Sequence, residues 1–152
     1  VTYYTDEKGE RHDKLYFTNS IHVPVYKQMS AFKKIEIEAQ LTGYSSAGCI
    51  TYVEVKHDVI HNIKSLEEML DFSMEHDIPY FAINVKIAQC HSCHERIWDT
   101  SLDCCPKCHS DKIDLLGRVT GYLSTTVEHF NNAKQDEFHN RKKHTSKSQL
   151  TD

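Results

Sequence analysis

Long apolar runs are missing from this chain of 152 residues, and so is a surplus of positive charge. No apolar stretch approaches the ~20 residues that a membrane-spanning helix needs, and no signal-peptide pattern opens the chain. The formal net charge is −4, whereas general nucleic-acid and anionic-membrane binders carry a clear basic surplus. With 39% hydrophobic and 26% charged residues, the composition is that of a globular protein. We therefore expect a moderate core, no membrane partner and no general affinity for nucleic acid.

Cysteine is absent from most of the chain, because five of the six cysteines fall within residues 90–108 and the sixth is Cys49. Secreted proteins that rely on disulfides usually spread their cysteines along the sequence. The clustering and the missing export signal favour a metal site in a reducing compartment, so we expect a cytoplasmic protein. The first residue is Val1 rather than methionine, which is typical of a processed protein or of a piece of a longer one.

Helical and strand patterns alternate along the first part of the chain. They predict helices over 30–41 and 65–76, and strands over 14–25, 49–55 and 80–87. The order strand, helix, strand, helix, strand is typical of parallel βαβ units, so the predicted fold class is α/β. So few elements cannot close a barrel alone, which indicates the last part of a larger α/β structure.

Local signals predict the ends of the two helices. Ser30 is a candidate N-cap of the first helix, although the alternation over 35–38 is more typical of a strand. Ser65 and Glu68 have the spacing of a capping box at the start of the second helix. Residues 77–79 contain a proline and are expected to end that helix.

Three further segments follow the clustered cysteines. Residues 112–123 have an extended pattern that two glycines interrupt, and 131–144 form a polar helix candidate. Residues 145–152 are a polar tail for which we expect disorder. There is no internal repeat and no low-complexity tract. The length fits one domain, or one domain with a small appendage.

Four of the clustered cysteines have the spacing of a metal site. Cys90 and Cys93 form one Cys-x-x-Cys pair, and Cys105 and Cys108 form a second pair after eleven intervening residues. Each pair can curl into a turn that aims two sulfurs at one point, and two such turns give the tetrahedral four-sulfur shell that zinc prefers. A closed shell has no position for a substrate water, so we predict structural zinc rather than a hydrolytic centre.

Other assignments of this cluster stay open from spacing alone. Four thiolates also suit iron, and the cysteines could instead form redox pairs or disulfides. Cys104 could replace Cys105, but its three intervening residues before Cys108 suit the turn less well. Because four sulfurs already complete the shell, the neighbouring histidines are interpreted as solvated loop residues: His91, His94 and His109.

The segment 118–123, RVTGYL, contains a glycine with two interpretations. Local rules alone treat Gly121 as a turn or close-approach glycine. The alternative is a glycyl radical, because only glycine has an α-carbon without a side chain, where a planar radical can delocalise into both flanking amide groups. Such a radical needs a buried and rigid loop, since oxygen destroys it.

The Arg-Val-x-Gly-Tyr pattern of this segment resembles the signature of the glycyl-radical enzymes. Four further features resemble the C-terminal part of the anaerobic (class III) ribonucleoside-triphosphate reductases: the four-cysteine cluster and the segments 16–25, 78–81 and 130–135. The resemblance covers most of residues 14–144. A zinc cluster followed closely by the glycine is specific to this family among the glycyl-radical enzymes.

The resemblance implies a fold made of several parts. Residues 1–88 would be the terminal α/β elements of a ten-stranded α/β barrel, and 89–116 would be a small zinc-ribbon-like domain. The glycyl-radical loop would occupy 117–130, and a C-terminal helix with a polar tail would occupy 131–152. The nucleotide-sensing region of the family and most of its barrel are outside the matched part.

The resemblance also implies an activity. The family reduces ribonucleoside triphosphates to deoxyribonucleoside triphosphates, the precursors for DNA replication, without oxygen and usually with formate as reductant. A separate iron–sulfur activase uses S-adenosylmethionine to form the glycyl radical. A cysteine upstream of the matched region then becomes the thiyl radical that attacks the ribose. We therefore expect the chain to act with the remainder of the catalytic chain and the activase, as a homodimer in the complete enzyme, and to be inactive alone.

The resemblance assigns roles to individual residues. Gly121 would store the radical. Asn19, Ser20 and His22 would line the active-site end of a strand, or would only bond a loop backbone. The residues around Gly121 would shape its loop: Arg118, Val119, Thr120, Tyr122 and Leu123.

The sequence departs from the family pattern in places. Many relatives carry cysteine where Thr120 stands, which leaves the glycine chemistry intact. Relatives often have glycine directly after each Cys-x-x-Cys turn, where this chain has His94 and His109. The tightness of the two turns is therefore in question. Cys49 lies downstream of the place expected for the attacking cysteine, and we interpret it as a buried core thiol.

A second hypothesis is a stand-alone zinc-ribbon module that binds nucleic acid or protein. Its basic residues lie within an acidic chain and no aromatic platform lies between them, which weighs against nucleic acid. Under the first hypothesis, the chain is either an excised or split piece of the reductase, or a stand-alone radical subunit that docks on an incomplete partner. The basic residues of the second hypothesis are Lys107, Lys112, Arg141, Lys142 and Lys143.

Overall fold

The computed structural model of the chain contains two compact units, which we call the α/β unit and the cysteine unit. The α/β unit comprises Phe17–Asn84 and Arg141–Asp152, and the cysteine unit comprises Val1–Tyr16 and Val85–Asn140. None of the helices in the described part of the chain has the length and apolar character that a membrane span requires. The polar tail predicted over 145–152 lies outside the described residues. The structure describes residues 2–18, 21–56, 59, 61–100, 102–119, 122–124 and 126–144.

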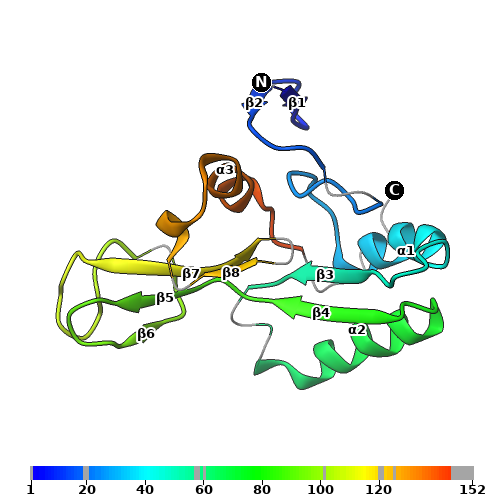
Figure 1. Cartoon of the computed structure of the whole chain (residues 1–152). Coiled ribbons are helices and arrows are strands. Elements are labelled where there is room, and N and C mark those ends of the chain that lie inside the picture. Colours follow the sequence, from blue (N-terminus) through cyan, green and yellow to red (C-terminus); the bar gives the residue numbers. More distant parts are fainter. Residues whose placement is uncertain are drawn as a thin grey trace. The chain divides into compact units, whose positions relative to one another are not determined.

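In the described residues of the α/β unit, two α-helices alternate with two strands. Helices α1 (Ala31–Thr42) and α2 (Ile63–Glu75) alternate with strands β3 (Ile50–Glu54) and β4 (Tyr80–Asn84). The two strands pair in parallel across the connection that contains α2, which makes a βαβ unit (Figure 1). The mixed α/β class, both predicted helices and the strand predicted over 49–55 are therefore confirmed.

Side chains that accept backbone hydrogen bonds define the starts of the two helices. The Ser30 hydroxyl accepts from the Lys33 amide, which confirms the predicted N-cap. The capping box predicted at Ser65 is wrong, because Asn62 caps α2 and its side-chain oxygen accepts from the Ser65 amide. Since Asn62 already satisfies a free N–H group of the first turn, the helix begins earlier, at Ile63.

The strand predicted over 14–25 is wrong. Strand β2 (Arg11–Lys14) ends where that prediction begins and pairs antiparallel with β1 (Thr2–Thr5), and no strand follows it among the described residues before α1. One reason is that the Val23 amide donates to the Glu38 carboxylate at 3.0 Å, and an amide bonded to a side chain cannot also join a strand ladder. The β1–β2 hairpin was not predicted.

A four-stranded antiparallel sheet is the centre of the cysteine unit. The extended conformation predicted over 112–123 is confirmed for the described residues 113–119 and 122–123, but Gly117 does not interrupt it, since it lies inside a strand. The single strand predicted over 80–87 is divided, since β4 ends at Asn84 and the next strand begins at Ile87. The sheet order is β6-β5-β7-β8, with β5 at Ile87–Cys90, β6 at Arg96–Ile97, β7 at Ile113–Val119 and β8 at Tyr122–Ser124.

One helix packs closely on this sheet. The polar helix predicted over 131–144 is present as α3 (Asn132–Asn140). The Phe138 ring lies so near Gly117 of β7 that an added Cβ there would come within 1.9 Å of it. Phe138 also packs with Val119, which is fully buried. Gly117 therefore permits the close approach of α3 to the strand that leads to Val119.

Each unit has its own small core. In the α/β unit, Ile35 of α1, Val53 of β3 and Met69 of α2 are fully buried. In the cysteine unit, Ala88 and Ile97 pack against two of the clustered cysteines. The cysteines therefore contribute to a core that has few aliphatic side chains.

Candidate metal centre

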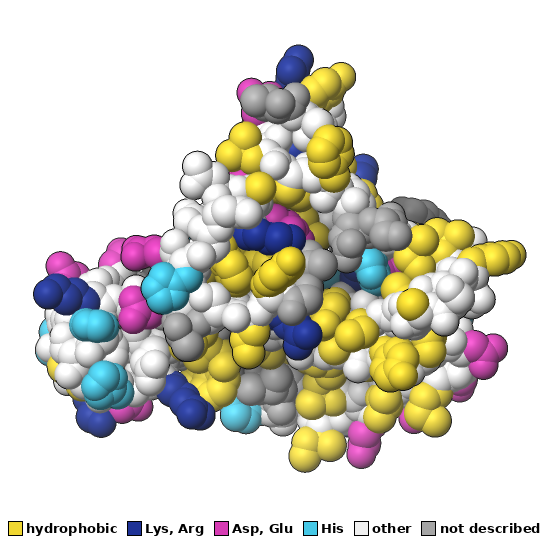
Figure 2. Space-filling view, viewed as in Figure 1, with side chains coloured by type: hydrophobic (Ala, Val, Ile, Leu, Met, Phe, Trp, Pro, Cys, Tyr) yellow, Lys and Arg dark blue, Asp and Glu magenta, His cyan; other side chains and the backbone are white. Residues whose placement is uncertain are grey.

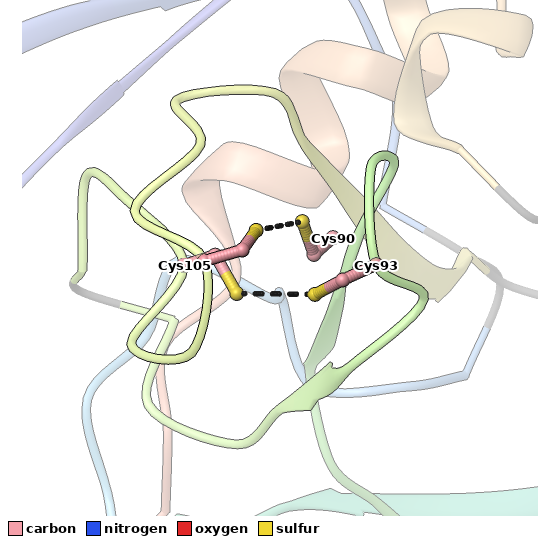
Figure 3. A group of neighbouring side chains, drawn as sticks. Cys90, Cys93 and Cys105 are labelled. Atoms are coloured by element: carbon pink, nitrogen blue, oxygen red, sulfur yellow. Dashed lines mark hydrogen bonds between the residues drawn. The ribbon is translucent and has the colours of Figure 1, made fainter.

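Four cysteine side chains converge between two loops of the cysteine unit (Figure 3). The sulfurs of Cys90, Cys93, Cys105 and Cys108 all lie within 4.8 Å of one another, and no disulfide joins them. Cys90 Sγ lies 3.5 Å from Cys108 Sγ, and Cys93 Sγ lies 3.6 Å from Cys105 Sγ. A tetrahedral zinc ion with bonds of ~2.3 Å separates its sulfur ligands by ~3.8 Å. The spacing therefore suits one metal ion bound by all four sulfurs.

The two Cys-x-x-Cys turns have the same backbone geometry. The His94 amide donates to the Cys90 carbonyl and the His109 amide donates to the Cys105 carbonyl, each at 2.9 Å. His94 and His109 have φ angles of 58° and 57°, in the left-handed region that favours glycine. The two turns are thus equally tight, and each left-handed histidine backbone costs about 1–2 kcal/mol.

The side chains next to the four sulfurs point to solvent instead of completing the metal shell. His91, His94 and His109 are exposed, and none of them belongs to the metal-binding group. Cys104 is also exposed and lies outside the group. The four sulfurs thus form the donor set by themselves.

The pKa values of two of the thiols are shifted in opposite directions. The pKa of Cys90 is lowered to about 6 by the Cys93 amide and then by the Cys108 thiol. The pKa of Cys108 is raised to about 12, because the Ser110 amide lowers it less than the Cys93 and Cys90 sulfurs together raise it. Adjacent thiolates repel each other. A divalent cation fits such a donor set, because it stabilises every thiolate that it binds.

Two of the basic residues considered for nucleic-acid binding face carboxylates. Lys107 Nζ lies 2.8 Å from Glu95 Oε2 in the cysteine unit. Arg141 Nη1 pairs with Glu54 Oε1 in the α/β unit. These charges are neutralised within their own units, which further weakens the nucleic-acid hypothesis.

Paired strands flank the predicted radical glycine. In the register of β7 and β8, Arg118 lies opposite Leu123 and Val119 lies opposite Tyr122. Val119 is fully buried, whereas the Tyr122 ring is 63% exposed and has Lys134 Nζ 5.1 Å from its centroid. Two predicted positions lie outside the described residues: Thr120 and Gly121.

His22 is the one described residue of the predicted active-site lining, because Asn19 and Ser20 lie outside the described residues. Its Nδ1 lies 3.1 Å from Glu38 Oε2, and its Nε2 lies 3.5 Å from Cys49 Sγ. The sequence pattern indicated His22 but neither of these two partners. No spacing rule could have found them, since the three residues come from separate segments.

Proteins similar to this chain share one description. A family model described as "Anaerobic ribonucleoside-triphosphate reductase" matches residues 2–144. The protein of that name from Escherichia coli (strain K12) is 34% identical over 148 residues, which cover 91% of this chain and 20% of that protein. The proteins of that name from Haemophilus influenzae and Enterobacteria phage T4 are 35% and 34% identical to this chain. Each match covers 87% of this chain, and the matches cover 19% and 23% of the two relatives, respectively. The chain thus spans about a fifth of the length of these curated relatives.

A solved structure of an anaerobic ribonucleotide reductase is also similar. It aligns with a TM-score of 0.53 and 23% identity over 73% of this chain and 17% of that one. At this identity the likeness concerns the fold alone, and it agrees with the mixed α/β architecture. The relationship to the family therefore rests on the sequence matches.

Proposed function

The chain belongs to the anaerobic ribonucleoside-triphosphate reductase family, and from that membership we propose that it is the C-terminal, radical-storing region of such an enzyme. The complete enzyme would be an oxidoreductase that converts ribonucleoside triphosphates to deoxyribonucleoside triphosphates by glycyl and thiyl radical chemistry, with formate as the usual reductant. One observation carries the proposal: the family match over 2–144 encloses both the four cysteines and segment 118–123. A stand-alone zinc-ribbon module would account for the cysteines only.

Zinc is the metal that we assign to the four cysteines. The mutual distances of at most 4.8 Å and the two equal turns support a closed four-sulfur shell, and no further donor joins the group among the residues that the structure describes. When bound, zinc would stabilise the four thiolates and link β5 to the loop that precedes β7. Iron suits the same donors, so the purified protein tests the choice: a colourless sample containing zinc supports it, and a red sample contradicts it.

Gly121 is the residue that we assign to radical storage. The strands on either side support this role, because β7 and β8 pair up to Val119 and Tyr122 and so hold both ends of the segment. Packing of Phe138 against Gly117 and Val119 adds rigidity on one side. A rigid backbone would protect a planar radical from reactions that need the loop to move.

The residues around Gly121 would shape the radical loop. Arg118 and Leu123 would contribute through their strand pairing, and Val119 and Tyr122 through the next pair. Thr120 stands where many relatives have cysteine, so it would not supply a thiol. In the same proposal, Asn19, Ser20 and His22 would line the active-site end of the barrel.

The exposed apolar surface of the α/β unit supports its place in a larger barrel. Parallel sheets in proteins are covered on both faces and normally exceed two strands. Here β3 and β4 stand as a two-stranded parallel sheet, with Tyr80 60% exposed and Ile50 38% exposed. We propose that the remainder of the reductase chain adds strands and covers these residues, completing a ten-stranded barrel.

We propose that the chain consists of the four regions that the family resemblance implies. Residues 1–88 would belong to the barrel, 89–116 to a zinc-ribbon-like domain, 117–130 to the radical loop and 131–152 to the C-terminal helix and tail. The complete enzyme would be a cytoplasmic homodimer activated by a separate S-adenosylmethionine-dependent iron–sulfur protein. Because the attacking cysteine is upstream of the matched region, this chain alone would not turn over nucleotides.

Electron paramagnetic resonance tests the radical assignment directly. The chain, joined to or mixed with the rest of a reductase, is incubated without oxygen with the activase, S-adenosylmethionine and a reductant. We expect a doublet from a glycyl radical, which Gly121→Ala abolishes. Gly43→Ala is the matched control, since Gly43 has open space around its α-carbon and an ordinary φ of −64°. A doublet that survives Gly121→Ala would refute the assignment, as would no signal in the wild-type protein.

A second readout uses oxygen after activation. Oxygen reacts with a backbone glycyl radical and cleaves the chain at that residue. We expect two fragments whose masses place the break at Gly121, and none from the protein that was not activated. Cleavage at another glycine would place the radical elsewhere.

A further inference from the structure

Three side chains of the α/β unit form a hydrogen-bonded chain. Cys49 Sγ lies 3.5 Å from His22 Nε2, and His22 Nδ1 lies 3.1 Å from Glu38 Oε2. Cys49 directly precedes β3, Glu38 is on α1, and His22 is in the segment before α1. The order cysteine, histidine, carboxylate is that of an activated thiol nucleophile.

Glu38 is held as a carboxylate at one end of this chain. Its side chain is fully buried, and it accepts from the Val23 amide at 3.0 Å and from the Lys34 ammonium group. Burial alone would raise the pKa of Glu38, but His22 and Lys34 lower it to about 2. A buried carboxylate that stays ionised can stabilise a positive charge on the adjacent imidazole.

The carboxylate determines which histidine nitrogen carries the proton. A carboxylate only accepts, so His22 Nδ1 must donate to Glu38. In the neutral ring, Nε2 then presents its lone pair to the Cys49 sulfur. The sulfur can therefore pass its proton to His22 without any rearrangement of the three side chains.

Cys49 is nearly buried, and this limits what it can react with. Only 9% of the residue is exposed, so a bulky reagent would not reach the sulfur. Burial, and then the charge of Glu38, raise the pKa of Cys49. The thiol therefore keeps its proton at neutral pH and depends on His22 to remove it during reaction.

We propose that Cys49 is a site of reversible oxidation by hydrogen peroxide, with His22 as the base and Glu38 as the residue that positions His22. His22 Nε2 takes the thiol proton while the sulfur attacks one peroxide oxygen and the O–O bond breaks. The leaving hydroxide takes the proton back from His22 and departs as water. Cysteine and hydrogen peroxide thus give cysteine sulfenic acid and water, and the peroxide is the electron acceptor.

The sulfenic acid has no second cysteine with which to form a disulfide in its own unit. The other five cysteines all lie between residues 90 and 108, within the cysteine unit. The oxidised form would therefore persist until an external thiol reduced it. This modification goes beyond the proposed radical storage and does not depend on it.

The test compares two cysteines in one chain. The zinc-loaded protein is treated with hydrogen peroxide, samples are quenched in denaturant containing dimedone, and peptides are measured by mass spectrometry. Cys104 is the internal reference, because it is exposed and belongs to no metal group. We expect Cys49 to be oxidised about ten-fold faster than Cys104 despite its burial, since a positioned base accelerates such reactions by ~10²-fold or more.

Variants of His22 separate base catalysis from simple accessibility. His22→Gln can still donate to Glu38 but cannot take a proton, and we expect it to slow Cys49 oxidation about ten-fold or more. Cys104 oxidation should not change. His139→Phe replaces an exposed histidine of α3 and should leave both rates unaltered.

The proposal fails if Cys104 outpaces Cys49 or if His22→Gln leaves the Cys49 rate unchanged. Glu38→Gln should also slow Cys49, and circular dichroism shows whether that variant is folded. The assay uses neither activase nor radical. Its failure would therefore leave the role of Gly121 untouched, just as a missing radical would leave the oxidation of Cys49 untouched.

Discussion

The α/β unit and the metal-binding part of the cysteine unit expose very different surfaces. Between residues 87 and 116, Trp98 and Leu102 are the exposed large apolar side chains among the described residues. Figure 2 shows charged and histidine side chains over the β5–β6 region, and hydrophobic ones gathered over α1, α2, β3 and β4. Among the described residues of the α/β unit, the exposed large apolar ones are Phe17, Leu41, Tyr44, Ile50, Ile63, Leu70, Met74, Tyr80 and Ile83.

This difference shows two ways to stabilise a small structure. Residues 87–116 bury Ala88 and Ile97 against cysteines, and a bound metal would supply the stability that so small a core lacks. The α/β unit instead leaves apolar surface on its helices and strands, which a larger assembly would cover. A bound metal would thus stabilise residues 87–116 from within, whereas burial of the exposed apolar surface of the α/β unit would require a partner surface.

Loss of one metal ligand should have the largest effect. Cys105→Ser removes a buried sulfur from the four-sulfur group, so we expect the zinc content to fall close to zero and the cysteine unit to lose its fold. The free energy involved is large, because structural zinc contributes ~10 kcal/mol in small domains. Elemental analysis and circular dichroism measure both changes.

Cys104→Ser is the matched control for this prediction, since Cys104 is exposed and outside the group. It should keep both the zinc and the fold. In the activated enzyme, Cys105→Ser should also abolish the radical at Gly121. A full radical yield in protein without zinc would show that the metal does not brace the radical loop.

The α/β unit should be most sensitive at Glu38. Glu38→Ala leaves the Lys34 charge and the Val23 amide without this buried carboxylate, so we expect a loss of about 3–5 kcal/mol in the free energy of unfolding. Urea unfolding of the zinc-loaded protein measures it. Zinc content should not change, because the four cysteines proposed as its ligands are in the other unit.

Glu36→Ala controls for the loss of a glutamate from the same helix. Glu36 is half-exposed and pairs with Lys33 at 3.0 Å. Exposed pairs of this kind contribute at most about 1 kcal/mol. If Glu38→Ala also released zinc, the stabilities of the two units would not be independent. The contrast between the α/β unit and residues 87–116 would then be wrong.

Acid should weaken the α/β unit through His144. Burial lowers the pKa of His144 from 6.5 to about 4, and its Nδ1 accepts from the Glu54 amide at 3.0 Å. Below pH 6.5 the unfolded chain binds a proton that the folded chain does not, so stability falls as the pH decreases toward 4. Between pH 6.5 and 5 we expect a loss of about 2 kcal/mol.

Urea midpoints at several pH values measure this effect. His144→Gln should flatten the profile over that range, because glutamine can accept the Glu54 hydrogen bond but does not titrate. An unchanged pH profile in the variant would show that His144 is not the group responsible. Acid also releases zinc from thiolates, so the zinc content is followed in parallel.

The smallest expected effect concerns the two Cys-x-x-Cys turns. His94 and His109 have left-handed backbones, and glycine adopts that conformation without a steric cost. We expect His94→Gly to stabilise the zinc-loaded protein by about 1 kcal/mol. His91→Gly, at a position outside the left-handed region, should instead destabilise by about 0.5–1 kcal/mol. Thermal unfolding measures the change in stability of each variant. Equal shifts of the two unfolding midpoints would show that the His94 backbone is not strained.

Local patterns predicted the helices better than the strands. Ser30 was predicted as the N-cap of α1 from its position before a helical pattern, and the structure confirms it. Asn62 was missed because an asparagine before a polar turn gives a weaker signal than a serine and glutamate in capping-box spacing. The strand over 14–25 failed because strand formation depends on a partner, and the Val23 amide bonds to a side chain instead.

The sequence alone predicted which four cysteines converge, because the geometry of the two turns is local. Two Cys-x-x-Cys turns form within a few residues of each cysteine pair, so their spacing was enough to identify Cys90, Cys93, Cys105 and Cys108. The family assignment likewise follows from residue patterns along the chain.

Only the tertiary structure decided what surrounds Cys49. Its contact with His22 spans 27 positions of sequence, and the contact of His22 with Glu38 spans 16. Such pairs form when α1, β3 and the segment between 21 and 30 fold against one another, and no sequence period encodes them. Cys49, which the sequence indicated as a buried core thiol, is buried as predicted and also lies 3.5 Å from His22 Nε2 in the folded chain.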